Sequence, residues 1–427
     1  MRVNRILPLL LGGLLLAGCG GGTADSPAQP TLATPLPTPT SLPTSAPTPF
    51  MSEATLPPVS QLTIWWPEPL APVDQAEVTE VLNAQIEAFG SAEDSIVNIE
   101  FRLKRPQEVG GVMQTLRSAS QVAPGALPDL TLMRREDMLV AAADGLIYPL
   151  EGLISSGIIG DLYAPALALG RYEGQIYGLP YMLDVRHIAY RPRPVTSTQW
   201  SFDGIVESGI QWAFPVGRTA GVNDTLYLQY LDAGGTPPDA EGNFTLNAAA
   251  LEQVLLYYEN AGETLSENVV SYTTQADYLP DLAAGRLQAG VLDSTTFLQL
   301  REEDNRLLAA PIPTLSGDAS ATLNGWMWVL TTTNSEQQAQ AARFLNWMME
   351  ADRQRQYAET IAMLPSQRSV LQSLDVVFMN TLVENAVVPP RGSSSLTRVI
   401  QNAVTRVLNG DVSAAQAVQE VAQTDNE

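Results

Sequence analysis

The chain has almost no cysteine or histidine, since Cys19 and His187 are its only residues of these types. A zinc site built from several Cys or His side chains is therefore excluded by count. A Ser-His-Asp triad could use only His187, and no G-x-S-x-G sequence lies near a predicted strand. His187 lies in the strand-like run Val185–Tyr190, so we interpret it as a polar residue held within a strand rather than as a catalytic base.

Basic charge is also scarce. The 427 residues include 46 acidic and 23 basic side chains, a net charge of −23, so the phosphates of a nucleic acid would be repelled. Lys104 is the only lysine, which argues against Schiff-base chemistry. The chain has no G-x-x-x-x-G-K-[ST] loop and no G-x-G-x-x-G after a strand. Two carboxylates suffice for a glycosidase, so that class of enzyme stays open.

Residues 59–427 contain no apolar run long enough to span a bilayer. The apolar segment Ile6–Leu16 is too short to do so as a mature helix; it follows two arginines and ends in Ala17-Gly18-Cys19. That order predicts a signal peptide over residues 1–18. Because Cys19 directly follows the small residues, it resembles the acylated cysteine of a bacterial lipobox. We therefore expect a lipid anchor at the extracytoplasmic face of the cell membrane and no disulfide in the mature fold.

The segment 19–58 is rich in Pro and Thr, as in Thr34-Pro35-Leu36-Pro37-Thr38-Pro39-Thr40. Such a composition cannot bury a core and favours an extended chain. It predicts a tether that holds the following domain away from the membrane.

The remaining residues, 59–427, are too many for one compact core and suggest two lobes. Hydrophobic periodicity predicts strands that alternate with helices, which favours a mostly parallel sheet covered on both faces. The expected strands are 61–66, 96–103, 129–133, 289–292 and 307–311, and the expected helices are 73–89, 108–122, 136–143, 247–260, 337–349 and 396–408.

Several passages, in their order along the chain, resemble the extracellular solute-binding proteins of ABC importers, in the family-1 branch that includes maltose- and oligosaccharide-binding proteins. The most specific one is Tyr172-Glu173-Gly174-Gln175-Ile176-Tyr177-Gly178-Leu179-Pro180-Tyr181. The others are Leu62-Thr63-Ile64-Trp65-Trp66, Leu127-Pro128-Asp129-Leu130, Ala143-Asp144-Gly145-Leu146-Ile147-Tyr148-Pro149-Leu150, Ala284-Gly285-Arg286-Leu287-Gln288-Ala289, Asn324-Gly325-Trp326 and Ala342-Arg343-Phe344-Leu345-Asn346-Trp347-Met348.

The resemblance implies an α/β, two-lobe periplasmic-binding-protein-like fold of type II, with a ligand cleft between lobes joined by hinge strands. Residues 59–182 and 309–330 would form the first lobe. Residues 183–308 and 331–421 would form the second, followed by a tail of residues 422–427. One departure concerns residues 191–209, where the family usually has a helix and this sequence shows no convincing one.

Sugars have flat apolar faces and a rim of hydroxyls, so a sugar site needs aromatic rings together with carboxylates, amides and arginines. Such residues belong at strand ends and in loops that face the cleft. The candidate ligand-binding residues are Trp66, Glu68, Tyr181, Asp184, Tyr227, Asp293, Trp326, Trp328 and Arg391.

Each candidate has a structural alternative. Alternation sends Trp65 and Trp66 to opposite faces of the first strand, and we expect Trp66 to face the cleft and Trp65 the core. The resemblance implies a ligand-facing role for Asp293 and a stacking role for Trp326. Core packing remains the alternative for Tyr227 and Trp328, hinge packing for Tyr181, and an ordinary exposed side chain for Arg391. Arg134 and Glu136, after the third strand, are further candidates that could instead form a solvated helix start.

These features predict a lipid-anchored substrate-binding component of an ABC importer, with a carbohydrate as ligand and no catalysis. The expected partners are the ligand, the permease subunits and the membrane, and we expect a monomer without cofactor, metal or nucleic acid. The alternatives are a binding protein for a polyamine or peptide, an extracytoplasmic sensor or adhesin that reuses the fold and, more distantly, a carboxylate-based glycosidase.

Overall fold

The computed structural model describes residues 60–424 apart from residues 93–96, 107–109, 193–199, 218–223, 240, 319–320, 375 and 377–378. The predicted signal peptide, Cys19 and the tether lie outside the described residues. Within the described part, none of the helices combines the length and hydrophobicity needed to traverse a bilayer.

Nine strands of the described residues form one mixed sheet in the order β2-β1-β3-β10-β6-β8-β7, with β9 and β11 also paired to β6. Their bounds are β1 (Ser60–Pro67), β2 (Val97–Lys104), β3 (Leu130–Arg134), β6 (Gly178–Tyr190), β7 (Trp212–Ala213), β8 (Ala289–Asp293), β9 (Leu308–Ala310), β10 (Thr322–Leu330) and β11 (Leu364–Pro365). A separate hairpin joins β4 (Arg171–Tyr172) to β5 (Gln175–Ile176).

The expected strands are present, but the expectation of a mostly parallel sheet is wrong for its centre. β1 pairs in parallel with β2 and β3, and β7 pairs in parallel with β8. The long central strand β6 is antiparallel to β8, β9, β10 and β11. The reason is that β6 and β10 run through both lobes instead of belonging to a strand–helix–strand unit.

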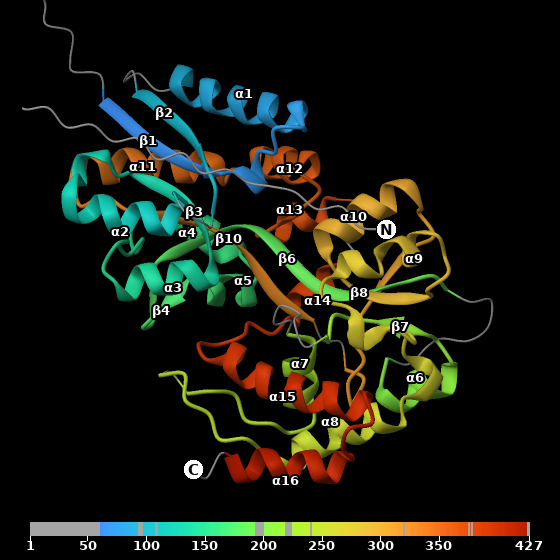
Figure 1. The fold of residues 1–427 in the computed structure, drawn as a ribbon. Coiled ribbons are helices and arrows are strands. Elements are labelled where there is room, and N and C mark those ends of the chain that lie inside the picture. Colours follow the sequence, from blue (N-terminus) through green and yellow to red (C-terminus); the bar gives the residue numbers. More distant parts are fainter. Residues whose placement is uncertain are drawn as a thin grey trace, which may run out of the picture. The chain divides into compact units, whose positions relative to one another are not determined.

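β6 and β10 connect the two halves of the sheet (Figure 1). Residues 178–183 of β6 pair with β10 and β11, whereas residues 186–190 pair with β8 and β9. The strand therefore passes from one set of partners to the other at Asp184–Arg186, and the register places Asn324 of β10 opposite Asp184. This crossing is where a hinge is expected.

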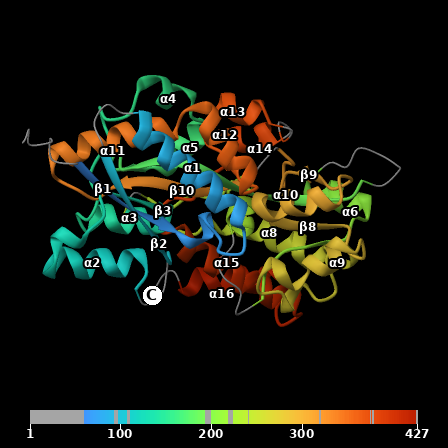
Figure 2. The same ribbon diagram turned by 90° about the horizontal axis from the view of Figure 1, so that it is seen from above.

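In the first lobe, helices cover both faces of the sheet (Figure 2). One core contains Trp66 with apolar residues of α1, α11 and α12, and the other contains Trp65 with residues of α2 and α3. The helices of this lobe are α1 (Ala76–Ala92), α2 (Val112–Val122), α3 (Arg135–Ala143), α4 (Ser156–Asp161), α5 (Ala164–Leu169), α11 (Ser335–Met348), α12 (Ala351–Thr360) and α13 (Arg368–Gln372).

In the second lobe, α8 contacts α7, α15 and α16. α8 shows why the sequence predicts its helix well. Leu251, Val254, Leu255 and Tyr258 lie on one buried face, and the Asn247 side chain accepts hydrogen bonds from the first free N–H groups. The remaining helices of this lobe are α6 (Phe202–Ser208), α7 (Thr225–Asp232), α8 (Ala248–Asn260), α9 (Leu279–Ala283), α10 (Ser294–Glu303), α15 (Ser393–Leu408) and α16 (Ala414–Thr424). α14 (Asn380–Glu384) packs on α5 and α13 of the first lobe and on β6.

The packing differs from the expected lobe boundaries in two places. α11, α12 and α13 fall in the range 331–421 that was assigned to the second lobe. However, α11 and α12 pack on β1 and α1 of the first lobe, and α13 packs on α12. β9 was assigned to the first lobe, but it pairs with the second-lobe end of β6. Both segments carry ordinary amphipathic patterns, and such a pattern does not say which lobe its apolar face meets. In addition, α16 continues to Thr424 and so includes part of the expected tail.

The segment 191–209 does contain a helix, contrary to expectation. α6 starts at the N-cap Ser201, whose hydroxyl accepts a hydrogen bond from the N–H of Gly204, and ends at Gly209 with φ of 61°. Its seven residues provide only two turns, too few for a clear hydrophobic period.

Candidate ligand-binding cleft

Two adjoining cavities lie between the first lobe and the second. The first, here called the proline cavity, has a volume of about 390 Å³ and is bounded by α3 and by residues 389–394. The second, the charged cavity, has a volume of about 400 Å³ and lies against the crossing strands β6 and β10. Glu136, Asp224, Asn324 and Ser394 line both, so we treat the two as one interlobe cleft.

The register of the sheet explains the floor of the charged cavity. Asp184 and Arg186 lie two residues apart on β6, so they point to the same face. Asn324 stands opposite Asp184, whereas Thr322 and Asp293 flank Arg186 on the two neighbouring strands. All five line the cavity, which shows that the sheet carries a polar patch at its crossing point.

Asp184 is held by partners from both lobes. The Ser294 hydroxyl donates to its Oδ1 at 3.1 Å, and the Arg134 guanidinium lies 3.7 Å from its Oδ2. Burial raises the pKa of Asp184, the nearby Asp293 raises it further, and the two arginines Arg134 and Arg186 oppose the shift. Asp184 therefore lines the cleft, and its role in ligand binding stays a prediction.

Asp293 also lines the charged cavity, and part of its hydrogen-bonding capacity is used within the fold. Its Oδ1 caps α10 by accepting from the N–H of Thr296 at 2.9 Å, and its Oδ2 accepts from the Gln275 amide at 2.6 Å. These bonds hold the carboxylate in place at the edge of the cavity.

Asp224 differs from the other two carboxylates. Within the part of the chain that the structure describes, its side chain has no hydrogen bond or ion pair, although it lines both cavities. Burial raises its pKa to about 6, Arg186 opposes the shift and Glu136 adds to it. A carboxylate so placed can accept hydrogen bonds from a ligand without giving up a hydrogen bond to any residue that the structure describes.

Three of the predicted aromatic residues lie in the core instead of the cleft. Trp66, Tyr181 and Trp328 are fully buried and form one cluster with Tyr357, in which the ring centroids of Trp66 and Trp328 are 5.2 Å apart. Alternation does separate Trp65 from Trp66, but both faces of β1 are covered and Trp65 is also buried. The expectation that Trp66 faces the cleft therefore needs correction.

The other aromatic candidates are similarly covered. Tyr227 is buried in the second-lobe core, the alternative that the sequence left open. Trp326 is 3% exposed, and the Arg134 guanidinium carbon lies 4.6 Å from its ring centroid. Arg134 itself lines the charged cavity, so it stands between this ring and the open space. Glu68 is exposed but lines neither cavity.

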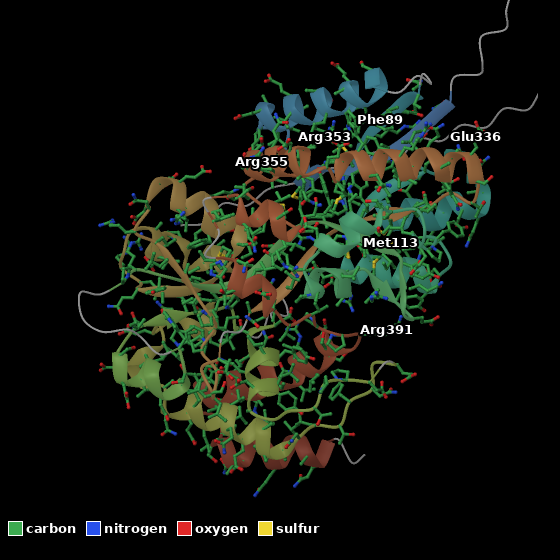
Figure 3. All side chains as sticks on the ribbon, turned by 180° about the vertical axis from the view of Figure 1, so that it is seen from behind. Phe89, Met113, Glu336, Arg353, Arg355 and Arg391 are labelled. Carbon is green, nitrogen blue, oxygen red and sulfur yellow. The ribbon has the colours of Figure 1, made fainter. Side chains whose placement is uncertain are left out.

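Arg391 lines the proline cavity on the second-lobe side, where Figure 3 labels it. Its guanidinium carbon lies 5.5 Å from the ring centroid of Tyr172, which belongs to the first lobe. The next residue, Gly392, has φ of 79° and lies against Gly242, where an added Cβ would come within 2.3 Å of the Gly242 carbonyl oxygen. The loop thus depends on glycine to bring Arg391 to the cleft.

His187 lies on β6 and is fully buried. Its Nδ1 is 2.8 Å from the Ile188 carbonyl oxygen, and burial lowers its pKa to about 4. It lines neither cavity, in agreement with a polar residue held within a strand.

Sequence reasoning missed several cleft residues, and Arg186, Thr322, Asn324 and Asp224 are among those that did not appear as candidates. Alternation from Asp184 could have found Arg186, since the two are i and i+2 on one strand. Asn324 belongs to the motif Asn324-Gly325-Trp326, in which Trp326 is the candidate ligand-binding residue. Thr322 and Asp224 become visible only when the strands are placed side by side and the lobes are assembled.

A family model described as bacterial extracellular solute-binding protein matches residues 84–383. Comparison with curated protein sequences gives no match. Among solved structures, a cyclic α-maltosyl-1,6-maltose binding protein from Arthrobacter globiformis has a TM-score of 0.68 at 15% identity, covering 86% of this chain and 98% of that one.

The sugar-binding protein MalE from Xanthomonas citri has a TM-score of 0.67 at 15% identity, covering 86% of this chain and 97% of that one. An ABC transporter solute-binding protein from Thermotoga lettingae, solved with α-D-tagatose bound, has a TM-score of 0.61 at 19% identity. The match covers 86% of this chain and 99% of that one. These likenesses establish the two-lobe solute-binding fold. Because the family model covers well over half of the sequence, the chain belongs to the bacterial extracellular solute-binding proteins.

Proposed function

We propose that this protein is the lipid-anchored substrate-binding component of an ABC importer and captures a carbohydrate in the interlobe cleft. The observation that carries the proposal is the chemistry of the cleft. Carboxylates, guanidiniums and an amide from both lobes and from the crossing strands converge on one space. Such groups accept from and donate to the hydroxyls of a sugar. The structural neighbours, whose described ligands are sugars, support the same ligand class.

The topology fits capture by closure. Each lobe contributes residues to the cleft, and the lobes are joined through β6 and β10 close to Asp184 and Asn324. Bending of these strands changes the width of the cleft, which is the hinge closure used by binding proteins of this shape. A closed, loaded protein then presents a distinct surface to a permease.

Membrane attachment rests on the sequence. Acylation of Cys19 would hold the protein at the membrane, and the Pro/Thr-rich segment would give it reach. Replacing Cys19 by Ala is expected to release the protein from membranes or to leave it unprocessed. A Cys19→Ala protein that is processed and fractionates like the wild type would contradict the anchor.

The family and its structural neighbours are binding proteins rather than enzymes. We accordingly assign no reaction to the carboxylates of the cleft. A sugar that is bound and recovered unchanged after long incubation agrees with this, whereas turnover would favour a glycosidase.

The ligand class can be tested by thermal shift and calorimetry on the full chain in a mild detergent, with monosaccharides, oligosaccharides, polyamines and short peptides as probes. A sugar at 100 times its dissociation constant is expected to add about 2.7 kcal/mol to the free energy of unfolding. Asp184→Asn should weaken that binding at least tenfold, and the exposed Asp74→Asn should not. Stabilisation by a polyamine or peptide and by no sugar would contradict the proposed ligand.

A further inference from the structure

The charged cavity has an excess of negative charge. Among the residues that the structure describes, five carboxylates line it, from Glu136, Asp137, Asp184, Asp224 and Asp293, against the two guanidiniums of Arg134 and Arg186. The lining therefore carries three more negative than positive side chains. A ligand that only donates hydroxyl hydrogen bonds leaves this excess in place when the cleft closes and water is displaced.

The arginines of the adjoining cavity reduce this excess without removing it, because Arg135 and Arg391 add two positive charges and the described lining of the whole cleft still has one more negative than positive side chain. Arg135 donates to the carbonyl oxygens of Ala168 and Leu169. Arg391 lies over the ring of Tyr172. Both line the proline cavity but not the charged one.

Two further observations restrict the chemical class of ligand that the cleft would bind. Among the described residues that line the two cavities, none is aromatic, so these residues supply no flat platform for the apolar face of a sugar ring. The carboxylate of Asp224 is largely buried, faces both cavities and has no partner within the described part of the chain. Recognition must therefore rely on charge and hydrogen bonds more than on stacking.

We propose that the ligand is a small sugar that carries a protonated amine, an amino sugar, with its ammonium group placed against Asp224 and Asp184 in the charged cavity. An ammonium group supplies three donors and one positive charge. It would give Asp224 a charged partner and reduce the excess negative charge of the lining, while Arg186, Asn324 and Thr322 remain available to the hydroxyls. This inference rests on the proposed function, because it specifies which carbohydrate the cleft selects.

Matched pairs of sugars test it, with glucosamine against glucose, galactosamine against galactose, and mannosamine against mannose as probes. Binding is measured by calorimetry on the full chain at pH 7 and at two salt concentrations. We expect the amine-bearing member of at least one pair to bind at least tenfold more tightly at low salt, with a smaller preference at high salt. Equal or tighter binding of every neutral member overturns the inference but leaves a sugar as the ligand.

Asp224→Asn provides the residue-level test, with Asp74→Asn as the matched control, because Asp74 is exposed and lines neither cavity. Asp224→Asn should lower the affinity for the amino sugar at least tenfold and change that of its neutral partner little. Asp74→Asn should change neither by more than about twofold, as expected for an exposed charge. A full preference retained in Asp224→Asn would overturn the placement of the amine.

The two proposals fail differently. If neutral sugars bind and no amino sugar does, only the amino-sugar inference is wrong. If neither kind of sugar binds and a non-carbohydrate solute does, the carbohydrate assignment is wrong and the amino-sugar inference falls with it.

Discussion

Two regions near the crossing of β6 and β10 have opposite compositions. One is the aromatic cluster of Trp66, Tyr181, Trp328 and Tyr357, which is buried and apolar. The other is the charged cavity, which is lined by carboxylates and guanidiniums and contains no ring among its described residues. The comparison shows that these four aromatic residues pack in the core of the first lobe, whereas the charged cavity, to which we assign ligand recognition, is lined by charged and polar side chains.

Trp66→Ala should have the largest effect on stability. Truncating a buried Trp in a packed core costs about 3–5 kcal/mol, because apolar contacts are lost and a cavity remains. Urea denaturation should show this loss of unfolding free energy, while ligand affinity of the folded fraction stays close to that of the wild type. A variant of normal stability that has lost its ligand would instead place Trp66 in the site.

Asp224→Asn should act in the opposite direction and stabilise the ligand-free protein at pH 7. Burial raises the pKa of this carboxyl from 3.8 to about 6, so the folded state binds its proton more tightly than the unfolded state does. The contribution of the Asp224 carboxyl group to the free energy of unfolding is therefore greatest below pH 3.8 and is lost as the pH rises through 6. Asn carries no charge at any pH and avoids this loss, which is at most about 3 kcal/mol at about 1.4 kcal/mol per pKa unit.

The check is denaturation of wild type and Asp224→Asn between pH 4 and pH 7. The variant should be more stable at pH 7, and its advantage should shrink towards pH 4. A variant that is less stable at pH 7 would mean that the Asp224 carboxylate has a stabilising partner in the fold.

Arg134→Ala should have a smaller effect on stability. It would also expose an aromatic ring, that of Trp326, to the charged cavity. The change removes the cation from the face of Trp326 and the ion pair with Asp184. A contact of a cation with an aromatic ring contributes about 0.5–2 kcal/mol, so a modest drop in Tm is expected. Quenching of tryptophan fluorescence by iodide should increase, because the Trp326 ring becomes exposed to the cleft. Unchanged quenching would show that other side chains cover Trp326.

Reducing agent should have no effect on Tm at all. Cys19 is the only cysteine in the sequence, so no intramolecular disulfide can form. A fall in Tm with reductant would point to a disulfide between two copies of the chain.

The general fold could be predicted because its signals are local or occur in order. Three such signals can be recognised in the sequence without knowledge of the tertiary structure: the amphipathic period of α8, the buried run of β3 and the order of the family motifs. The lobe assignment of α11 and α12 could not be predicted, because both lobes offer apolar surfaces to such helices.

The site was harder, and Tyr181 shows why. The pairing of β6 with β10 is irregular here, since Trp326 pairs with Met182 and Met327 pairs with Pro180, so the register skips Tyr181. Simple alternation therefore fails at the hinge, and Tyr181 packs in the core. Asp184 lies beyond this irregularity, on the regular part of the strand, and its side chain lines the cleft. The partners of Asp184 come from distant segments, such as Ser294 and Arg134, and no local pattern indicates them.

Amide hydrogen exchange of the full chain, with and without a saturating sugar from the binding panel, tests most directly whether the ligand occupies the interlobe cleft. We predict slower exchange in three regions that line it: residues 134–137, the paired stretches 184–186 and 322–324 of the two crossing strands, and residues 391–394. The segment around Trp66 in β1 should be unchanged, because it is already buried. Protection confined to other segments, with these three unchanged at saturation, would contradict the account.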